Sequence, residues 1–269
     1  MPKKILLCYP EGKHKALTMS YDDGVEADVR LVDIFNRNGI KGTFHINSGM
    51  FGTLGARQRL TEEEAVALYK GHEVSAHTLT HPTIARSPRE QLIHEIFEDR
   101  KNLERLFGYT VRGMSYPNGS YTSQIKDLLP HLGIEYSRVV ETTGGFGLPD
   151  DWLEWKGTCH HNRNLMQHAE AFAGLDKTQY LYLMYVWGHS YEFDNDNNWE
   201  LMEQFCEFIG GRNDIWYATN IEIVDYVKSY SRLRFSAAQD FVYNPNAHSL
   251  WLSVDGDIVE VKGGTQVQL

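Results

Sequence analysis

The sequence predicts an α/β protein built as a barrel of about seven strands, with a small β extension at the C-terminal end. Short apolar strands alternate with amphipathic helical stretches over residues 1–234, as is typical of parallel strands joined by right-handed crossovers. The chain has 269 residues, a common length for one closed α/β barrel. Residues 235–269 contain only short strand-like segments. We therefore expect a barrel domain over 1–234 and a β appendage over 235–269.

The elements follow from hydrophobic periodicity and from local helix signals. Strands are expected at 15–20, 43–47, 73–77, 111–116, 134–137, 181–188 and 215–219. Helices are expected at 28–37, 62–70, 88–107, 122–132, 198–209 and 221–229. Ser87 and Pro88 predict the start of the third helix and Gly108 predicts its end, while Thr61 with Glu64 predicts a capping box on the second.

The C-terminal segment has the pattern of short β-strands. These strands are expected at 235–243, 249–254, 257–262 and 265–269. Asp255 and Gly256, between the second and third of them, are typical of a two-residue hairpin turn. Because so few strands rarely fold alone, we expect them to pack on the barrel.

Composition and charge exclude several classes of function. The net charge is −10 and no Lys/Arg cluster stands out, which argues against binding to a nucleic-acid backbone. No stretch reaches the roughly 18 consecutive apolar residues that a membrane helix needs, so no membrane partner is expected. The first ten residues lack the apolar region of a signal peptide, and the three cysteines are far apart. Both observations predict a cytoplasmic location.

The most reactive side chains follow the ends of four predicted strands. They are Asp22 and Asp23 after the first strand, His77 and His81 after the third, Tyr116, Pro117 and Asn118 after the fourth, and His189 after the sixth. In a parallel barrel the loops that follow the strands gather at one face, where catalysis takes place. The sequence therefore predicts one site at that face.

His77 and His81 are spaced so that their imidazoles can share one metal ion. The spacing alone is a weak signal, but an Asp-Asp-Gly turn at the end of another strand strengthens it. An ordinary turn is the alternative for Asp22 and Asp23. Two adjacent carboxylates after a buried strand repel each other, however, unless a cation lies between them. Two histidines and one carboxylate leave an open coordination position, as in hydrolytic Zn²⁺ sites.

Three segments resemble motifs of one known family. Thr18–Gly24 resembles the first motif of the polysaccharide deacetylase (NodB-homology, carbohydrate esterase) family, and His77–Pro82 resembles its second. Val186–His189 is similar to its last motif, and the three occur in the family's order over residues 15–230. The resemblance implies a distorted (β/α) barrel. It also implies metal-dependent removal of an acetyl group from an N-acetylated sugar or small oligosaccharide.

The same resemblance assigns a role to each matching residue. The metal ligands that it implies are Asp23, His77 and His81. The metal would be Zn²⁺, with Co²⁺ or Ni²⁺ as alternatives. Asp22 would act as general base on a water molecule, and His189 would protonate the departing amine as general acid. Backbone N–H groups around Tyr116 and Asn118 would help the metal to stabilise the oxyanion.

The third motif departs from the family pattern. The family has an arginine there that pairs with the base aspartate, but this chain has Ser115 at that position. Arg112, three residues earlier, is the candidate substitute. The alternative is that Arg112 is an exposed arginine at the start of a strand.

The fourth motif, which supplies an aspartate partner for the acid histidine and a tryptophan in the cleft, is also irregular. The nearest candidates are Asp150, Asp151 and Trp152, with Asp194 and Asp196 as rivals for the aspartate. Glu192 is also nearby and is considered as a substrate ligand instead. Trp155, Trp187 and Tyr121 are further candidate surfaces for a sugar ring, and Trp187, next to the acid histidine, is favoured.

Residues 159–161 contain two further histidines, so we consider a second metal site there. Adjacent side chains of an extended segment point to opposite faces, so Cys159, His160 and His161 are not expected to chelate one ion. We expect two of the three to be structural, while one could reach the cleft.

Other functions on this scaffold stay open. They are hydrolysis of another amide such as a cyclic ureide or imide, O-acetyl ester hydrolysis, and catalytically silent carbohydrate binding. Relatives of the first kind often lack the full metal set, and a silent binder would tolerate loss of Asp22 and His189. All of these residues are present. The sugar, its length, the native metal and the oligomeric state are left open.

Overall fold

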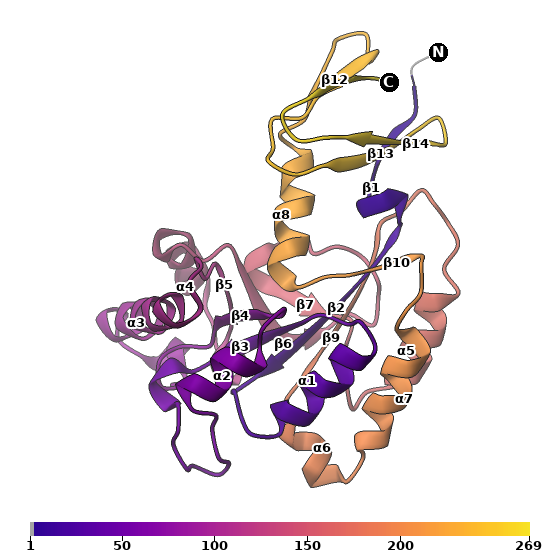
Figure 1. The fold of residues 1–269 in the computed structure, drawn as a ribbon. Helices are drawn as coiled ribbons and strands as arrows, with labels where there is room; N and C mark the ends of the chain where they lie inside the picture. Colours follow the sequence, from indigo (N-terminus) through magenta and orange to yellow (C-terminus); the bar gives the residue numbers. More distant parts are fainter. Residues whose placement is uncertain (1–2) are drawn as a thin grey trace.

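A sheet of parallel strands forms the centre of the computed structural model, which describes residues 3–269 (Figure 1). Its strands are β2 (Lys15–Asp22), β3 (Gly42–Ile46), β4 (Glu73–Ala76), β5 (Gly113–Ser115), β6 (Tyr136–Thr142), β7 (Trp155–Gly157), β8 (Cys159–His160), β9 (Tyr182–Gly188) and β10 (Ile215–Tyr217). Every strand that the sequence predicts before residue 235 corresponds to one of these. The sequence pattern does not predict β7 and β8.

The segment that contains β7 and β8 closes the sheet into a barrel. β7 pairs with β6, and β8, which begins two residues later, pairs with β9. Thr158 lies between them, and its N–H donates to the carbonyl of Tyr185 at 2.7 Å. The extended segment 155–160 thus pairs with both β6 and β9, which would otherwise be the two edge strands of the sheet. The predicted barrel is confirmed, but the last predicted strand, β10, is not its closing strand, because it pairs only with the first half of β2.

Helices lie outside the barrel, between successive strands (Figure 1). They are α1 (Asp28–Arg37), α2 (Glu62–Leu68), α3 (Arg89–Phe107), α4 (Ser123–Leu128), α5 (Leu165–Ala173), α6 (Tyr191–Asp196), α7 (Trp199–Ile209) and α8 (Asn220–Tyr230). Short 3-10 turns are η1 (Pro10–Gly12), η2 (Ser48–Met50), η3 (Ile84–Arg86), η4 (Pro117–Gly119), η5 (Leu129–Leu132) and η6 (Trp152–Glu154). The sequence pattern does not predict α5 and α6.

The predicted helix ends are confirmed at two of three places. Thr61 and Glu64 form the expected capping box at the start of α2. Gly108 follows α3 with a φ of 75°, the left-handed conformation that glycine adopts without strain. The start expected at Ser87 and Pro88 is one residue early, because Pro88 is the N-cap of α3, makes no side-chain hydrogen bond and is followed by Arg89 as the first helical residue. No helix within residues 3–269 has the length and apolar character needed to cross a membrane.

The barrel strands are apolar outside and polar inside. On β2 the outward side chains are Leu17, Met19 and Tyr21, and the inward ones are Thr18, Ser20 and Asp22. Because side chains alternate along a strand, a polar residue at every second position gives a polar interior. Thr18 Oγ1 donates to Asn220 Oδ1 at 2.8 Å, and Ser20 Oγ lies 2.9 Å from His45 Nε2. The main apolar core lies between barrel and helices.

The N-terminus of α8 plugs the end of the barrel at which the strands begin. Glu73, the first residue of β4, accepts the Ile221 N–H at 2.9 Å and the Thr43 hydroxyl at 3.0 Å through Oε2. Its Oε1 accepts the Tyr136 hydroxyl at 2.6 Å. Burial raises the pKa of Glu73 to about 7, and these donors offset only part of that effect. This end of the barrel is therefore filled, and the open chemistry lies at the other end.

The β extension consists of two small antiparallel sheets beyond the plugged end (Figure 1). One contains β11 (Arg234–Phe235), β12 (Phe241–Tyr243) and β15 (Gln266–Gln268), and the other contains β1 (Ile5–Cys8), β13 (Leu250–Val254) and β14 (Asp257–Val261). Asp255 and Gly256 both have positive φ, as a tight hairpin turn requires. Residues 5–8 pair with β13 and therefore belong to the extension, not to the barrel as the boundary at 234 predicts.

Candidate active site

Asp22 ends β2 inside the open end of the barrel. Its Oδ1 accepts the Ser115 hydroxyl at 3.1 Å, and its Oδ2 accepts the guanidinium of Arg138. Burial opposes ionisation of this carboxyl, but the charges of Arg138 and His77 hold its pKa well below the usual range. Asp22 is therefore a carboxylate ready to accept a proton. Its Oδ2 lies 3.7 Å from His77 Nε2 and 4.0 Å from His189 Nε2.

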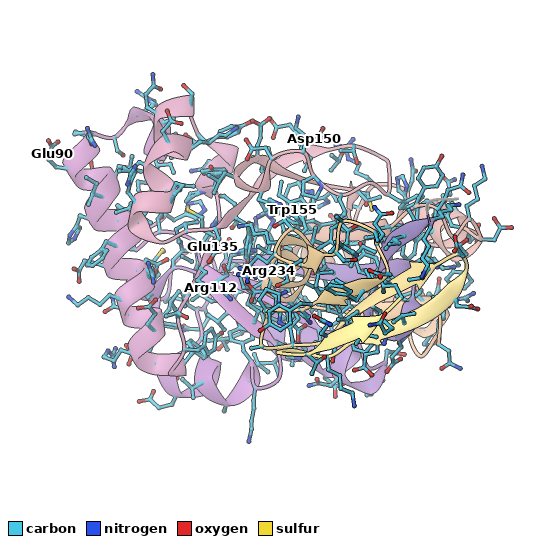
Figure 2. All side chains as sticks on the ribbon, turned by 90° about the horizontal axis from the view of Figure 1, so that it is seen from above. Glu90, Arg112, Glu135, Asp150, Trp155 and Arg234 are labelled. Carbon is cyan, nitrogen blue, oxygen red and sulfur yellow. The ribbon has the colours of Figure 1, made fainter. Side chains whose placement is uncertain are left out.

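Arg138 on β6 is the cationic partner of Asp22, and the prediction of Arg112 for this role is wrong. Arg112 instead pairs with Asp225 at 2.6 Å and with Glu135 at 3.1 Å. Arg112 and Glu135 lie close together in Figure 2, which looks onto the end of the barrel that faces the extension. Arg138 is only 1% exposed. An arginine two residues after Tyr136 in a strand shares its inward face, and this was the signal available in the sequence.

Trp187 supports Arg138 from β9. The guanidinium carbon of Arg138 lies 4.4 Å from the centre of the Trp187 ring, within the range of a cation–π contact. Trp187 is 8% exposed, so the predicted role as a flat surface for a sugar is not what its contacts show. The ring instead holds the partner of the base.

Asp23, His77 and His81 converge at the open end, as the sequence predicts. The Oδ1 of Asp23 lies 4.0 Å from His77 Nε2 and 3.8 Å from His81 Nε2. Asp23 and His81 have φ values of 89° and 61°, in the left-handed region that non-glycine residues rarely occupy. Such backbone strain clusters at ligand sites.

The residues of this trio fit a divalent cation. The buried Oδ1 of Asp23 makes no hydrogen bond within residues 3–269, although Arg59 lies 3.3 Å away and also donates to the Asp23 carbonyl. His77 Nδ1 donates to the carbonyl of Ser115 at 2.9 Å, which leaves the Nε2 lone pair facing Asp23. Burial lowers the pKa of His77 to about 4, so its ring is neutral. A neutral imidazole and a carboxylate are the donors that Zn²⁺ takes.

His189 follows β9 and has Glu192 as its partner. The backbone N–H of His189 donates to Glu192 Oε2 at 3.1 Å, and the ring Nδ1 of His189 lies 3.5 Å from the same oxygen. Burial alone would lower the pKa of His189, but the carboxylates of Glu192 and Asp22 raise it above its usual value. His189 thus faces Asp22 as a ring that can donate a proton.

The predicted aspartate partners of His189 are wrong, because each is engaged elsewhere or lies away from the ring. Asp151 pairs with Lys126 at 2.5 Å. Asp194 accepts the Trp199 indole N–H at 2.7 Å, and Asp196 accepts the side-chain amide of an asparagine. Asp150, labelled in Figure 2, lies beside Asp151 in the loop before η6. Glu192, predicted as a substrate ligand, fills the role instead.

The two residues predicted for the oxyanion differ in what they offer. The Tyr116 N–H donates to the carbonyl of Arg138 at 3.1 Å, and its hydroxyl donates to the carbonyl of Leu153 at 2.8 Å. Tyr116 therefore has no free backbone donor. The N–H of Asn118 makes no hydrogen bond among the described residues, and Asn118 is exposed with a φ of 56°. Of the predicted pair, Asn118 alone retains a donor.

Trp152 lies outside this group of residues. Its ring packs against Trp155 at 4.8 Å between centroids. Trp155 begins β7 and contacts Tyr136, so it belongs to the end of the barrel at which the strands start. The prediction of Trp152 in the cleft is therefore wrong.

His160 and His161 both reach one carboxylate, against expectation. Their Nε2 atoms lie 3.0 Å and 3.2 Å from Glu192 Oε2. β8 ends at His160 and the chain turns over 161–164, so the strict alternation of a strand does not apply to His161. Burial lowers the pKa of His161 to about 3, while the neighbouring histidines hold the pKa of Glu192 well below its usual range although burial opposes this.

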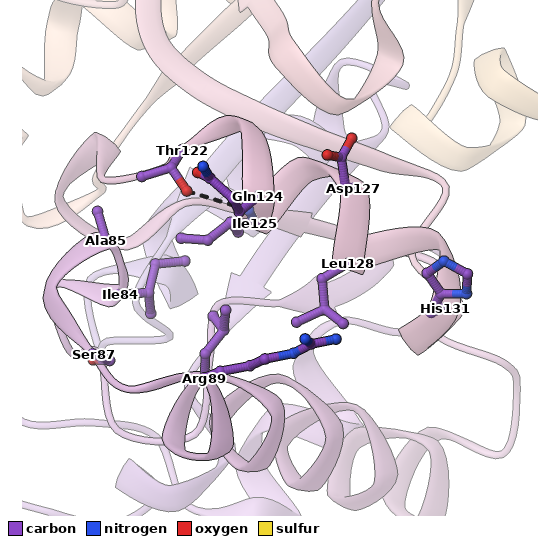
Figure 3. Close-up of a pocket in the computed structure, with 11 residues that line it drawn as sticks. Ile84, Ala85, Ser87, Arg89, Thr122, Gln124, Ile125, Asp127, Leu128 and His131 are labelled. Atoms are coloured by element: carbon purple, nitrogen blue, oxygen red, sulfur yellow. Dashed lines mark hydrogen bonds between the residues drawn. The ribbon is translucent and has the colours of Figure 1, made fainter.

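A cavity of about 490 Å³ lies beside these loops without containing the reactive group (Figure 3). Ile84 and Ala85, shortly after His81, line one side of it, and Thr122 and Ile125 line another. None of the carboxylates or histidines described above contributes to it. The site is therefore defined by its chemistry and not by this hollow.

Fold and site together define a class of protein: an α/β barrel with a buried carboxylate, a histidine that can be protonated and a trio of candidate cation ligands at one end. Residues 9–137 match the polysaccharide deacetylase family, the family that the sequence resemblance predicts.

Sequence relatives agree with this assignment. The peptidoglycan-N-acetylglucosamine deacetylase PgdA of Listeria monocytogenes is 25% identical over 122 residues, which are 44% of this chain and 25% of that protein. Chitin deacetylase 1 of Cryptococcus neoformans is 25% identical over 118 residues, which are 43% of this chain and 24% of that protein. The matches thus span about a quarter of the length of these relatives.

Solved structures show the same fold. A Mycobacterium smegmatis protein assigned to the polysaccharide deacetylases aligns with a TM-score of 0.60 at 15% identity, covering 86% of this chain and 96% of that one. The chitin deacetylase of Colletotrichum lindemuthianum aligns with a TM-score of 0.54 at 18% identity, covering 81% and 89%. At these identities the comparison establishes the fold alone.

Proposed function

We propose that this protein is a metal-dependent hydrolase that removes an acetyl group from an N-acetylated sugar or short oligosaccharide. The observation that carries the proposal is the position of Asp22. This ionised carboxylate lies beside the candidate ligand Asp23 and 4.0 Å from the ring of His189. Amide hydrolysis needs a base, an acid and a stabilised oxyanion in one place. The relatives named as deacetylases of peptidoglycan N-acetylglucosamine and of chitin support the choice of substrate.

The residues of the chain divide the reaction between them. A divalent cation held by Asp23, His77 and His81 would supply Lewis-acid polarisation of the acyl carbonyl. Asp22 accepts a proton from the attacking water as the water oxygen bonds to the acyl carbon. The Asn118 N–H offers a hydrogen bond to the oxyanion that develops there.

The acid then completes the cleavage. The C–N bond breaks and its electron pair goes to the nitrogen. His189 donates its Nε2 proton to that nitrogen, acetic acid and a free amine leave, and the proton that Asp22 took from the water returns to His189. The low pKa of Asp22 and the raised pKa of His189 favour this division of roles.

The alternatives are weaker on structural grounds. The ligand trio is complete, which does not favour a ureide or imide hydrolase of the kind that lacks it. A silent carbohydrate-binding protein would not need a base and an acid whose reactive atoms lie 4.0 Å apart. Ester cleavage uses the same machinery, so an O-acetyl sugar is tested together with the N-acetyl ones.

The deciding experiment measures acetate release from N- and O-acetylated sugars and their short oligomers. The protein is stripped with a chelator and reloaded with Zn²⁺, Co²⁺ or Ni²⁺. We expect release from N-acetylated substrates only after loading. Asp22→Asn should lower kcat by about 10²–10⁴-fold while the bound metal stays. Full activity of the stripped protein, or no release from any acetylated sugar, would contradict the proposal.

A further inference from the structure

The carboxylate of Glu192 lies where three imidazoles converge. Its Oε2 is 3.0 Å from His160 Nε2, 3.2 Å from His161 Nε2 and 3.5 Å from His189 Nδ1. The same oxygen accepts the backbone N–H of His189 at 3.1 Å. The ligand-type atoms of His160, His161 and Glu192 are close enough to hold a cation. The cluster is therefore either a second cation site or a set of N–H donors on one carboxylate, and the ring protons decide between the two.

The proton of His160 points to the donor arrangement. His160 Nδ1 accepts the backbone N–H of Asn162 at 3.2 Å. A ring whose Nδ1 accepts a hydrogen bond carries its proton on Nε2, which is the nitrogen that faces Glu192. A metal ligand needs a lone pair at that position and usually donates from its other nitrogen. His160 therefore offers Glu192 an N–H group and offers a cation nothing.

His161 supports this arrangement by packing. Its ring lies between the rings of Tyr21 and Phe193, with centroid distances of 5.7 Å and 4.1 Å, and it is fully buried. It also rests against Gly188, where a Cβ would lie 2.1 Å from His161 Nδ1. Neither of its ring nitrogens makes a hydrogen bond among the described residues, so His161 gives Glu192 a fixed wall and not a donor.

We propose that His160 and His161 are positioning residues for the acid step, an inference that rests on the proposed function. The Nε2–H group of His160 holds Glu192 against the packed ring of His161, so that the carboxylate faces Nδ1 of His189. This contact turns Nε2 of His189 toward Asp22 and the departing nitrogen. The segment that closes the barrel thus also fixes the acid. His160 packs against Trp187, the support of Arg138, at 4.6 Å between ring centres, and a phenylalanine at position 160 retains this ring contact.

The test separates the acid step from the rest of the reaction. His160→Phe and Glu192→Gln are compared with wild type on an N-acetylated oligosaccharide, whose amine must be protonated as it leaves. The same variants are measured on 4-nitrophenyl acetate, whose phenolate leaves without a proton. We expect kcat for the amide to fall by about 10–100-fold, as for other residues that orient a catalytic group. KM for the amide and kcat for the ester should stay near wild type.

Controls keep the outcome decisive. His168→Phe on α5 makes the same exchange at a ring that contacts Phe146 and none of the site residues, so it should retain both activities. His160 is partly exposed, which makes its variant the safer one for folding if Glu192→Gln is unstable.

Three results would overturn the inference. They are equal losses on amide and ester, no loss on the amide, and the loss of one bound metal per chain in His160→Phe, which would make the cluster a cation site. Absence of acetate release by the wild type from every amide would be a different failure. It would refute the proposed function and, with it, this inference.

Discussion

Two clusters of histidines around a carboxylate lie at the same end of the barrel, and their rings are oriented in opposite senses. In the first, His77 Nδ1 donates to Ser115 and its Nε2 lone pair faces Asp23. In the second, His160 Nδ1 accepts from the backbone and its Nε2 proton faces Glu192. We infer that the same residue types make a candidate cation site in one place and a hydrogen-bonded support in the other. The hydrogen-bond partner of Nδ1, the ring nitrogen farther from the carboxylate, determines which nitrogen of each ring carries the proton.

The spacing of the two clusters does not separate them. Ligands about 2.1 Å from a tetrahedral ion lie roughly 3.4 Å from one another. The nitrogens of the first cluster are 3.8 Å and 4.0 Å from Asp23 Oδ1, and the Nε2 atoms of the second are 3.0 Å and 3.2 Å from Glu192 Oε2. Both sets of atoms are close enough to surround an ion, so the position of the ring protons makes the distinction.

The largest expected effect is the loss of bound metal from the first cluster alone. His81→Ala removes one of three donors, so the variant should bind less than about a tenth of the Zn²⁺ that wild type retains after dialysis and should release no acetate. His160→Phe, the matched change in the second cluster, should retain its metal. Metal per chain, measured by atomic emission, checks both. Stoichiometric metal in His81→Ala would refute the contrast.

The next effect concerns Arg138, the observed partner of Asp22, and Arg112, the predicted one. Arg138→Met leaves Asp22 buried without its cation, which should lower the free energy of unfolding by about 3–5 kcal/mol. Arg112→Met removes a partly exposed pair with Asp225 and should cost about 0–1 kcal/mol. Denaturant titration measures both. Equal costs would show that Arg138 is not the buried partner of the base.

Glu73 is a third buried carboxyl group, and its pKa shows the effect of burial without a cationic or histidine partner. Glu73 is held by neutral donors alone, and burial raises its pKa to about 7 from the usual 4.5. The folded state therefore binds a proton that the unfolded state has released between pH 4.5 and 7. The free energy of unfolding should fall as pH rises through this window, by about 3 kcal/mol. Glu73→Gln should lose this contribution.

The measurement is denaturant titration of wild type and Glu73→Gln at pH 4.5 and at pH 7.5. The difference between the two proteins isolates Glu73 from other buried carboxyls, such as Asp28 and Asp99, whose pKa is also raised to about 7. Parallel pH dependence in both proteins would mean that Glu73 titrates normally.

The sequence predicts the parts of this molecule that depend on local pattern. Strands and helices show their own periodicity, and Asp22, Asp23, His77, His81 and His189 each follow a strand end that the pattern marks. These residues meet because parallel strands bring their ends together. The cation trio and the base could therefore be found without a structure.

What the sequence does not predict depends on closure of the barrel. Arg138 reaches Asp22 across 116 residues of chain; strand alternation places Arg138 on the same face as Tyr136 but does not identify Asp22 as its partner. The closing segment 155–161 is too short and irregular to show a period, so its two histidines are placed on opposite faces by a rule that fails where β8 ends. Glu192 takes the place of the aspartate that the family pattern suggests, from a six-residue helix that the pattern also misses.

The prediction with the smallest effect concerns which ring nitrogen carries the proton in each of the two clusters. A ¹⁵N–¹H correlation spectrum of the histidine side chains in the metal-free protein reports which ring nitrogen carries the proton. We expect His77 to be protonated on Nδ1, because Ser115 O can only accept. We expect His160 to be protonated on Nε2, because its Nδ1 already accepts a backbone N–H.

Assignment by His160→Phe identifies the second signal, and Zn²⁺ gives an independent check. Added Zn²⁺ should shift the resonances of His77 and His81 while those of His160 keep their Nε2 proton, since no lone pair is available there. A Nδ1-protonated His160 that shifts with the metal would make the two clusters alike and would replace the support by a second cation site.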